Sequence, residues 1–474
     1  MQWKTLAVDL DGTLIRSDML IESAFAFLKA NPLRFYRPLM WLARGGKAHL
    51  KSKLAEVTHV DVTTLPYDPK VIEWLTRERA AGRTLVLATA SDARYAEAIS
   101  GHLGLFDKTM ATDGKVNLSS SRKRDALVHE YGNKGFDYAG NSRDDLAVWK
   151  AAERAYVVNP SPGVERSAQK IGNVESVLET RKNPLRTWVK ALRMHQWLKN
   201  LLIFIPLLAS HQITSLRLDV RGVLAFVLFG LCASSVYLLN DLLDLDDDRH
   251  HPTKRRRPFA SGSLSIVWGV VAFPVLAFCA FAGALIFLPW RFAAVLGGYY
   301  VLTMAYSFLL KRRVILDVVV LAMLYTARII AGTAAFGFAL TFWLLGFSMF
   351  LFLSLALVKR YAELYATRAA GNEKARGRGY LADDLPMLSS LGAASGYLAV
   401  LVLALYIQDS KTTHLYNHPQ VIWLACPLLL YWISRTWLIT HRGLMHDDPV
   451  VFAAKDRTSL LIVVLMGVVF WAAI

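Results

Sequence analysis

The chain has 474 residues, of which 54% are hydrophobic, and a formal net charge of +17. So apolar a composition excludes a wholly soluble protein, and the length is sufficient for two or three domains. Residues 1–180 carry 25 Lys and Arg against 22 Asp and Glu, while residues 181–474 carry 29 against 15. Because basic loops beside long apolar runs are typical of anionic membranes, and no nucleic-acid-binding motif is present, we expect a membrane partner and no nucleic acid.

Residues 1–180 alternate short apolar runs with helical patterns. The expected strands "TLAVDL", "TLVLATA", "FDYAGN" and "RAYVVN" are separated by segments such as "PKVIEWLTRERAAG" and "SRKRDALVHEYG". This alternation predicts an α/β domain in which helices cover a parallel sheet. A mostly helical insert at about 16–80 predicts a cap. The N-terminus lacks the pattern of a cleaved signal peptide, so we expect this domain in the cytoplasm.

The first expected strand ends in "DLDGT", which places Asp9 and Asp11 two residues apart. Both carboxylates therefore leave the strand end on the same side. Two acids at this spacing can share Mg²⁺ while one attacks phosphorus and the other transfers a proton. Further motifs follow in order: a strand ending in Thr89, a helix opening at Lys123, and a strand followed by Asn141, Asp144 and Asp145.

These four motifs resemble those of the haloacid dehalogenase (HAD) superfamily of phosphatases, over residues 1–175 and including the cap. The resemblance implies a Rossmann-like fold in which Asp9 is the nucleophile and forms an aspartyl phosphate. It implies that Asp11 is the general acid/base, that Thr89 donates a hydrogen bond to the phosphoryl group, and that Lys123 neutralises its charge. Asp145 would complete the Mg²⁺ site with Asp9 and Asp11.

The fourth motif departs from the family pattern. It usually begins Gly-Asp, whereas this chain has "GNSRDD", so that Asn141 stands in the place of the acid. The neutral carbonyl oxygen of Asn141 is still a ligand that Mg²⁺ accepts. An alternative is a catalytically silent domain that serves as a regulatory or scaffold module.

The segment 181–198 predicts a linker that runs into an amphipathic helix on the membrane surface. Beyond it the sequence predicts an all-α polytopic membrane domain over 199–474 with nine spans. The expected spans are 199–216, 220–240, 264–287, 291–310, 314–337, 340–358, 386–408, 419–438 and 458–474. Residues 241–262, 311–313, 359–378 and 435–457, after the second, fourth, sixth and eighth spans, carry 18 Lys and Arg, whereas the intervening loops, counted with the first two residues of the span that follows, carry 4. The positive-inside rule therefore predicts an inner-membrane protein with its first domain and both sites on the cytoplasmic face.

The stretch "NDLLDLDDDRHHPTKRRRP" follows the second expected span. On a helix, Asp241, Asp244 and Asp248 fall at i, i+3 and i+7 on one face, with Asn240 beside them. Carboxylates this close to a membrane need cations, and hard oxygen ligands suit Mg²⁺. The stretch therefore predicts a site for a magnesium diphosphate. The alternative is a solvated acidic helix end paired with a basic loop.

Basic and polar residues recur around this stretch. Lys254 and Arg257 lie a turn or more beyond the acids, where they can bind the same phosphates. The other cytoplasmic helix ends supply further candidates for binding substrate: Lys199, Lys311, Asp317, Tyr325, Arg328, Lys359 and Arg360. Their spacing does not decide which of them binds which phosphate.

Residues 185–474 resemble the UbiA superfamily of intramembrane prenyltransferases. Within it the strings "NDLLDLDDDRHHPTKRRRPFASG", "RMHQWLKN", "LDVVVLAMLYTARIIAGTAA" and "DDPVVFAAKDRT" resemble the decaprenyl-phosphate phosphoribosyltransferase branch. In aromatic prenyltransferases the second polar cluster is usually another Asp-x-x-x-Asp, whereas here Asp317 is followed by Tyr325 and Arg328. The resemblance implies that polyprenyl phosphate attacks the anomeric carbon of phosphoribosyl diphosphate, with Asp241 and Asp244 as catalytic Mg²⁺ ligands.

The two resemblances together predict a bifunctional enzyme. The transferase product would still carry a 5-phosphate, which a HAD phosphatase on the same face could remove. An alternative is a UbiA-type aromatic prenyltransferase with an accessory or regulatory HAD domain; a transporter is disfavoured because no charge pair is expected mid-membrane. The cap segment "NPLRFYRPLMWLARGG", with Phe35, Tyr36 and Trp41, either lies on lipid headgroups or packs its apolar face into the cap.

Overall fold

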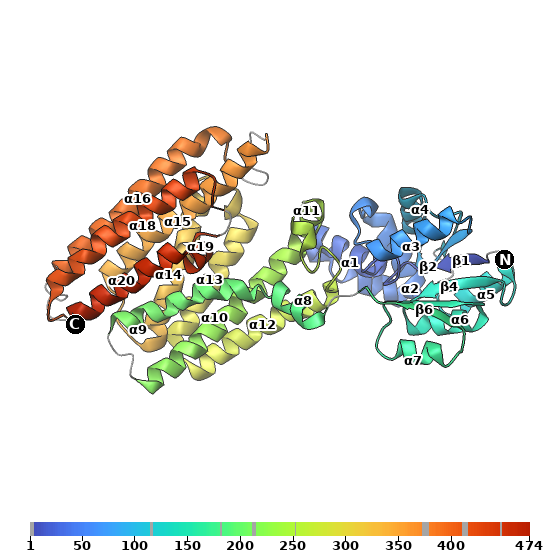
Figure 1. The fold of residues 1–474 in the computed structure, drawn as a ribbon. Helices are drawn as coiled ribbons and strands as arrows, with labels where there is room; N and C mark the ends of the chain where they lie inside the picture. The colour runs from blue at the N-terminus through green and yellow to red at the C-terminus, as the bar shows by residue number, and fades with distance from the viewer. Residues whose placement is uncertain are drawn as a thin grey trace. The chain divides into compact units, whose positions relative to one another are not determined.

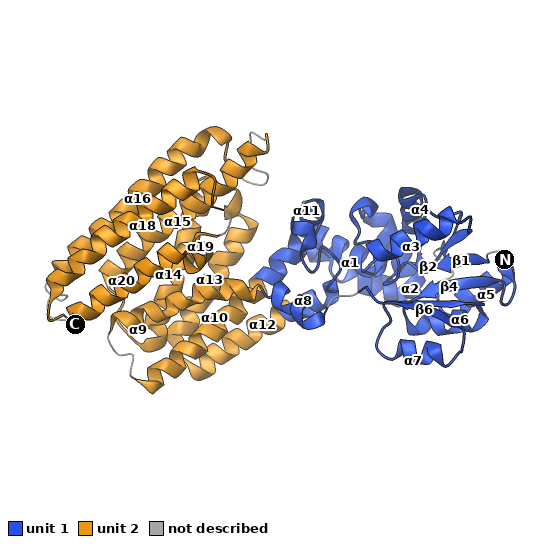
Figure 2. Ribbon diagram, in the orientation of Figure 1, with its two compact units in different colours: residues 1–192, 237–272 blue, residues 193–236, 273–474 orange. Residues whose placement is uncertain are grey.

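The computed structural model describes residues 4–113, 117–180, 183–210, 215–251, 253–371, 379–409, 416–445 and 448–474. These residues form two compact units (Figure 2). Unit 1 comprises residues 1–192 and 237–272, and unit 2 comprises residues 193–236 and 273–474. The acidic stretch that follows the second expected span therefore belongs to the same compact unit as the α/β domain.

The α/β domain is built on one parallel sheet of six strands in the order β3-β2-β1-β4-β5-β6 (Figure 1). The strands are β1 (Thr5–Val8), β2 (Leu85–Asp92), β3 (Lys108–Thr112), β4 (Phe136–Gly140), β5 (Ala155–Val158) and β6 (Val174–Leu178). The strand order changes direction at β1: β2 and β3 lie on one side of it, and β4, β5 and β6 lie on the other. In sheets of this kind ligands bind at the carboxyl ends of the strands at that point.

Successive residues of a strand point to opposite faces of the sheet, and the inner strands of this sheet are largely apolar. Both faces therefore carry apolar side chains, which helices cover. Leu6 and Val8 of β1 share a hydrophobic cluster with α3 (Pro69–Ala80) and α4 (Ala93–Leu103). Ala7 shares the opposite cluster with α5 (Ser121–Tyr131), α6 (Leu146–Ala151) and α7 (Val164–Gln169). The predicted α/β domain with a parallel sheet is confirmed.

The cap consists of α1 (Met19–Ala30), the 3-10 helices η1 (Pro32–Arg34) and η2 (Val62–Thr64), and the long helix α2 (Arg37–Val57). It has a small core of its own, in which Trp41 meets Phe27 with ring centroids 5.3 Å apart. Phe35 and Tyr36 are instead 65% and 52% exposed. Trp41 therefore belongs to the cap core, while Phe35 and Tyr36 face outward, and their contact with lipid headgroups stays a prediction.

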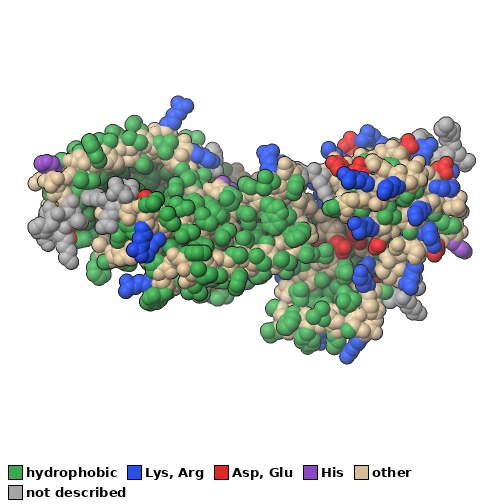
Figure 3. Space-filling model, turned by 90° about the horizontal axis from the view of Figure 1, so that it is seen from below, with side chains coloured by type: hydrophobic (Ala, Val, Ile, Leu, Met, Phe, Trp, Pro, Cys, Tyr) green, Lys and Arg blue, Asp and Glu red, His purple; other side chains and the backbone are tan. Residues whose placement is uncertain are grey.

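The remaining elements in the described ranges are helical. They are η3 (Arg143–Asp145), α8 (Pro184–Ala191), η4 (Met194–Phe204), α9 (Ile205–Ala209), α10 (Leu216–Leu243), α11 (Leu245–His250), η5 (Lys254–Arg256), α12 (Ile266–Phe287), α13 (Trp290–Phe308), η6 (Leu310–Arg312), α14 (Leu316–Phe336), α15 (Phe342–Ala369), η7 (Ala382–Asp384), α16 (Leu385–Ile407), η8 (Pro419–Leu424), α18 (Ala425–His441), α19 (Pro449–Lys455) and α20 (Arg457–Ala473). Figure 3 shows hydrophobic side chains over much of the surface of the helical part, as expected where lipid replaces water.

The nine spans predicted from the sequence are not confirmed. Within the described ranges six helices are long and apolar enough to cross a membrane, or seven if α19 and α20, bent by 81°, count as one span. The first expected span, 199–216, overlaps the end of the 3-10 helix η4 and contains the five-residue α9, whose second residue is Pro206. The helix α13 has 19 residues, but Arg291, three Tyr and two Gly lower its hydropathy.

Candidate active sites

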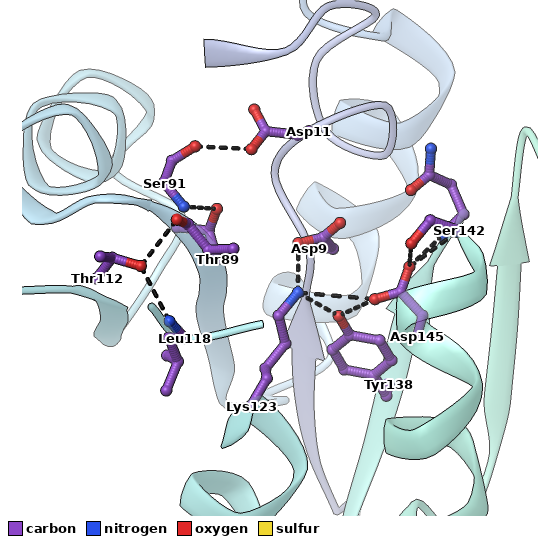
Figure 4. A network of polar contacts seen from close by, with 12 residues as sticks. Asp9, Asp11, Thr89, Ser91, Thr112, Leu118, Lys123, Tyr138, Ser142 and Asp145 are labelled. Atoms are coloured by element: carbon purple, nitrogen blue, oxygen red, sulfur yellow. Dashed lines mark hydrogen bonds and ion pairs between the residues drawn. The ribbon is translucent and has the colours of Figure 1, made fainter. Parts of the chain in front are cut away.

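The first site lies at the carboxyl edge of the sheet, where β1 and β4 end side by side (Figure 4). Asp9 follows β1 directly and donates its backbone N–H to the Ala139 carbonyl of β4 at 2.9 Å. Gly12 has φ +76°, and a Cβ atom there would lie 2.1 Å from the Asn141 amide nitrogen. Glycine at this position therefore lets the loop after β1 close against Asn141, beside Asp9 and Asp11.

Lys123, in the first turn of α5, is the cation of this site. Its ammonium donates to Asp9 Oδ1 at 2.7 Å and to the Tyr138 hydroxyl at 2.9 Å, and it lies 3.6 Å from Asp145 Oδ1. Burial raises the pKa of Asp9 to about 6, although Lys123 lowers it, and the nearby charge of Asp145 raises it further. Burial lowers the pKa of Lys123, but Asp9 and Asp145 hold it above its usual value. Lys123 thus stays charged opposite Asp9.

Asp11 is held by two donors from different elements. Its Oδ1 accepts from the Met19 backbone N–H at 2.8 Å and its Oδ2 accepts from the Ser91 hydroxyl at 2.7 Å. Burial raises the pKa of Asp11 to about 7, and the charges of Asp18 and Asp9 add to this effect. A carboxyl that titrates near neutral pH is suited to proton transfer. Thr89, fully buried in β2, accepts from the Ser91 N–H at 3.0 Å.

Asp145 is occupied by hydrogen bonds on both oxygens. Its Oδ2 accepts from the backbone N–H groups of Asn141 (3.0 Å) and Ser142 (2.9 Å) and from the Ser142 hydroxyl (2.9 Å), and its Oδ1 accepts from the Tyr138 hydroxyl (2.7 Å). These bonds hold Asp145 in one orientation, and its role as a direct Mg²⁺ ligand stays a prediction. A carboxylate bound in this way fixes the turn after β4, and so it fixes Asn141.

The side-chain oxygen atoms at this edge of the sheet are ligands that suit Mg²⁺. No group of three or more His, Cys, Asp or Glu that could hold a metal ion occurs in the part of the chain that the structure describes. Mg²⁺ typically takes one or two carboxylates and completes its shell with water and substrate phosphate. The carboxylates of Asp9 and Asp11 with the side-chain oxygen of Asn141 match that pattern.

Sequence reasoning missed several residues of this site. Tyr138 and Ser142 lie inside the quoted motifs and Ser91 directly follows one, but nothing in the pattern marks their hydroxyl groups as bonded to Asp145 or Asp11. Lys51 comes from α2 of the cap and donates to the Ala90 carbonyl at 2.7 Å. Burial lowers the pKa of Lys51 below its usual value, and the nearby charges of Asp11 and Asp18 offset only part of this effect, so Lys51 lies close to the acids.

The acidic segment, residues 240–257, also lies in unit 1. The expected single helix is interrupted: α10 ends at Leu243, Asp244 has φ −90° and ψ 13°, and α11 begins at Leu245. Backbone bonds from Asp244 N–H to the Asn240 carbonyl (2.9 Å) and from Asp248 N–H to the Asp244 carbonyl (2.8 Å) preserve the spacing of the acids. Asn240 and Asp244 are half-buried.

Arg257 joins the first and last acids of this segment. One guanidinium nitrogen lies 3.1 Å from Asp241 Oδ1 and 2.7 Å from Asp248 Oδ2, and both carboxylates are buried. The pair of buried carboxylates around one cation is a set of hard oxygen donors that suits Mg²⁺ with a diphosphate. Lys254, in η5, is exposed.

A basic cluster in unit 2 converges on Asp448, the residue that caps α19. Asp448 Oδ2 lies 2.7 Å from the Lys199 ammonium and 3.3 Å from that of Lys359, and the Tyr325 hydroxyl donates to the same carboxylate at 3.1 Å. We call these four residues the Asp448 cluster. Asp448 was not among the predicted site residues, although it lies in the quoted string "DDPVVFAAKDRT".

Arg328, predicted as a phosphate ligand, lies in the same unit. Its Nε donates to the Asn200 side-chain oxygen at 3.1 Å and its Nη2 to the Tyr299 hydroxyl at 3.2 Å. The guanidinium also lies 5.2 Å from the ring centre of Phe229 and 5.7 Å from that of Tyr325. Aromatic faces stabilise a buried guanidinium, so these contacts hold Arg328 in one orientation.

Asp317 and Arg360 bind each other. Asp317 Oδ2 lies 2.6 Å from Arg360 Nη2, and its Oδ1 accepts from the Tyr380 hydroxyl at 2.6 Å. Neither charged side chain is more than 1% exposed. Their predicted role in binding substrate stays a prediction, as does that of Lys311, which lies in η6 between α13 and α14.

Two family models match the chain. Residues 6–150 match the haloacid dehalogenase-like hydrolase model, and residues 202–454 match the model of the UbiA prenyltransferase family. The chain belongs to the UbiA prenyltransferase family. It is an enzyme with an N-terminal HAD hydrolase domain and a UbiA-type transferase domain, and it is an integral membrane protein.

Three relatives of this UbiA-family chain differ in how much of it they match. An uncharacterized protein, y4nM of Sinorhizobium fredii, is 39% identical over 98% of this chain and 90% of its own length. Nodulation protein NoeC of Azorhizobium caulinodans is 37% identical over 61% of this chain and 94% of its own length. A decaprenyl-phosphate phosphoribosyltransferase of Mycolicibacterium smegmatis is 30% identical over 58% of this chain and 88% of its own length. Both domains thus recur together in at least one relative.

Proposed function

We propose that the protein is a bifunctional enzyme that makes polyprenyl-phosphoryl ribose in two steps. The UbiA domain transfers 5-phosphoribose from phosphoribosyl diphosphate to a polyprenyl phosphate such as decaprenyl phosphate, and the HAD domain then removes the 5-phosphate. The observation that carries the proposal is the joining of two parts in one chain. One part resembles proteins named decaprenyl-phosphate phosphoribosyltransferase, and the other holds Lys123 2.7 Å from Asp9 at a phosphatase motif.

In the phosphatase step Asp9 attacks phosphorus and Asp11 passes a proton to the leaving ribose oxygen. Asp11 then takes a proton from the water that hydrolyses the aspartyl phosphate. Lys123 and Thr89 stabilise the charge on the phosphoryl oxygens. Mg²⁺ held by Asp9, Asp11, Asn141 and Asp145 would supply further positive charge at the phosphoryl group.

In the transfer step the phosphate oxygen of the lipid attacks the anomeric carbon of the donor, and diphosphate leaves. Asn240, Asp241, Asp244 and Asp248 would hold Mg²⁺, which would neutralise the departing diphosphate. The cations assigned to the phosphates of donor and lipid are Lys199, Lys254, Arg257, Lys311, Arg328, Lys359 and Arg360, with Asp317 and Tyr325 as further substrate-binding residues. We place both reactions on the cytoplasmic face of the inner membrane, where the basic loops are expected.

The test is mass spectrometry of the lipid products. Detergent-solubilised protein is incubated with Mg²⁺, polyprenyl phosphate and phosphoribosyl diphosphate, alongside Asp9→Asn and Asp241→Asn variants. The parent should yield ribosyl lipid, Asp9→Asn should stop at the 5-phosphoribosyl lipid, and Asp241→Asn should yield neither. If the parent transfers no ribose but joins a prenyl diphosphate to an aromatic acid, the protein is instead an aromatic prenyltransferase with an accessory HAD domain.

A further inference from the structure

We propose that the HAD domain positions the acidic segment through a buried ion pair between Glu22 and Arg249, independently of its phosphatase chemistry. Glu22 lies on α1 of the cap, and Arg249 lies on α11 within the acidic segment. Both belong to unit 1. This inference rests on the proposed transfer reaction, because it assigns Glu22 and Arg249 as positioning residues for that reaction.

The geometry of the pair is specific. Arg249 Nη2 donates to Glu22 Oε1 at 2.7 Å and Arg249 Nη1 donates to Oε2 at 3.1 Å, so the contact is bidentate. The Ser17 hydroxyl donates to the same Oε1 at 2.5 Å. Both charged side chains are only 4% exposed. A bidentate pair fixes the relative orientation of its partners, and removing one partner leaves a buried charge without compensation.

Arg249 is adjacent to the proposed Mg²⁺ ligands. It follows Asp248, whose carboxylate shares Arg257 with Asp241. The helix that carries Asp248 and Arg249 has only six residues, and a helix this short does not hold its conformation without tertiary contacts. The Glu22 contact is a buried tertiary anchor of α11, so we infer that it fixes where Asp248 and Arg257 lie.

The other side of the pair is rigidly held by the HAD domain. The helix α1 begins at Met19, whose N–H donates to Asp11, and Asp18 caps it by accepting from the Leu20 N–H at 2.8 Å. Close backbone contact supports the same interface: a Cβ atom at Gly262 would lie 2.7 Å from the Arg16 carbonyl oxygen. Glu22 therefore projects from a helix start that is tied to the phosphatase loop.

Exposed charge pairs around this contact supply a matched control. Lys29 lies 2.8 Å from Asp246, and the two side chains are 33% and 67% exposed. An exposed ion pair contributes little free energy because water and salt screen its charges. The buried pair is not screened in this way, so the loss of one partner leaves the other charge uncompensated. If opposite charge alone were enough to position the acidic segment, substitutions in the buried pair and in the exposed pair would have the same effect on the transfer reaction.

The experiment compares Glu22→Gln, Arg249→Gln, Arg249→Lys, the exchanged pair Glu22→Arg with Arg249→Glu, and the control Lys29→Ala, all in full-length protein. The transfer reaction is followed in the Asp9→Asn background, so that phosphatase activity does not enter. The KM for phosphoribosyl diphosphate should rise about tenfold or more in the two Gln variants and less in Arg249→Lys. It should change less than about threefold in Lys29→Ala. The exchanged pair should recover part of the loss.

A second measurement does not depend on activity. Hydrogen exchange of residues 245–257, without Mg²⁺ or donor, should become faster in both Gln variants and stay at the parent rate in Lys29→Ala. Parent-like exchange and KM in the Gln variants would overturn the inference, as would an Arg249→Lys variant that behaves like the parent in both assays. If the parent transfers no ribose, the proposed function fails, while the exchange data still decide whether Glu22 anchors α11.

Discussion

The Lys123→Met substitution tests the phosphatase site most directly, because it removes the cation and keeps most of the side-chain volume. Lys123 is 5% exposed and Asp9 is 9% exposed, with 2.7 Å between the ammonium and the carboxylate. Removing one partner of a buried pair costs about 3–5 kcal/mol. If that loss falls on the transition state, kcat/KM falls by about two to three and a half powers of ten, at about 1.4 kcal/mol for each factor of ten.

The same substitution should also move the pH profile. Burial raises the pKa of Asp9 to about 6, and Lys123 opposes this rise. Without Lys123 the pKa of Asp9 should increase further, so a larger fraction of this nucleophile is protonated and inactive at neutral pH. The acidic limb of kcat/KM should therefore shift to higher pH.

The assay is hydrolysis of p-nitrophenyl phosphate between pH 5 and 9, with Tyr138→Phe as the matched control. That variant loses the hydroxyl bonded to Lys123 and Asp145 but keeps every charge, so we expect a loss of about 1 kcal/mol, or roughly fivefold, and an unshifted limb. A Lys123→Met enzyme within a few fold of the parent, or one whose acidic limb stays in place, would refute the ion-pair reasoning.

Four other variants probe separate parts of the chain. Gly12→Ala should abolish phosphatase activity and leave ribosyl transfer intact in lipid mass spectrometry, because its Cβ would overlap the neighbouring amide. Asp448→Asn should lower ribosyl transfer about tenfold or more and spare p-nitrophenyl phosphate hydrolysis, because two adjacent lysines lose their carboxylate. Replacing Phe35 and Tyr36 by Ser should impair dephosphorylation of a lipid substrate more than of a soluble one, with equal losses counting against membrane docking. Trp41→Ser should instead lower the melting temperature, because its ring packs in the cap core.

The α/β domain could be predicted because its signals are local. An apolar run that ends in an acid predicts both the strand β1 and the position of Asp9 at its end. The order of the motifs predicts that Lys123 lies opposite Asp9, as the structure has it. The bonds that hold these residues could not be predicted in the same way. Tyr138 and Ser142 fix Asp145 through hydroxyl groups, whose partners depend on how a turn closes in three dimensions.

The membrane domain was predicted less completely. Apolar length alone suggested a span at 199–216, but the 3-10 helix η4 and the short α9 occupy its described residues. The Asp448 cluster brings together side chains separated by 249 residues, as for Lys199 and Asp448. Spacing along a helix cannot reveal such a contact, because it arises from packing between elements remote in sequence.

Several of the proposed phosphate-binding cations are paired with carboxylates in the structure, which gives a further prediction about affinity. Lys123 faces Asp9, and Arg257 faces Asp241 and Asp248. If Mg²⁺ takes these carboxylates and phosphate takes these cations, every charge stays paired only when both ligands bind together. Either ligand alone would leave a buried charge uncompensated, which is costly.

Mg²⁺ and phosphate should therefore bind with positive coupling, and the coupling must be reciprocal. For the phosphatase site we expect orthophosphate to tighten Mg²⁺ binding about tenfold or more in isothermal titration of the Asp241→Asn protein, in which the second site is weakened. The Lys123→Met substitution, which leaves phosphate without its cation, should reduce that factor toward one. Independent binding of the two ligands to the protein that retains Lys123 would show that these ion pairs do not exchange partners, and Lys123 would then serve to hold Asp9 in place.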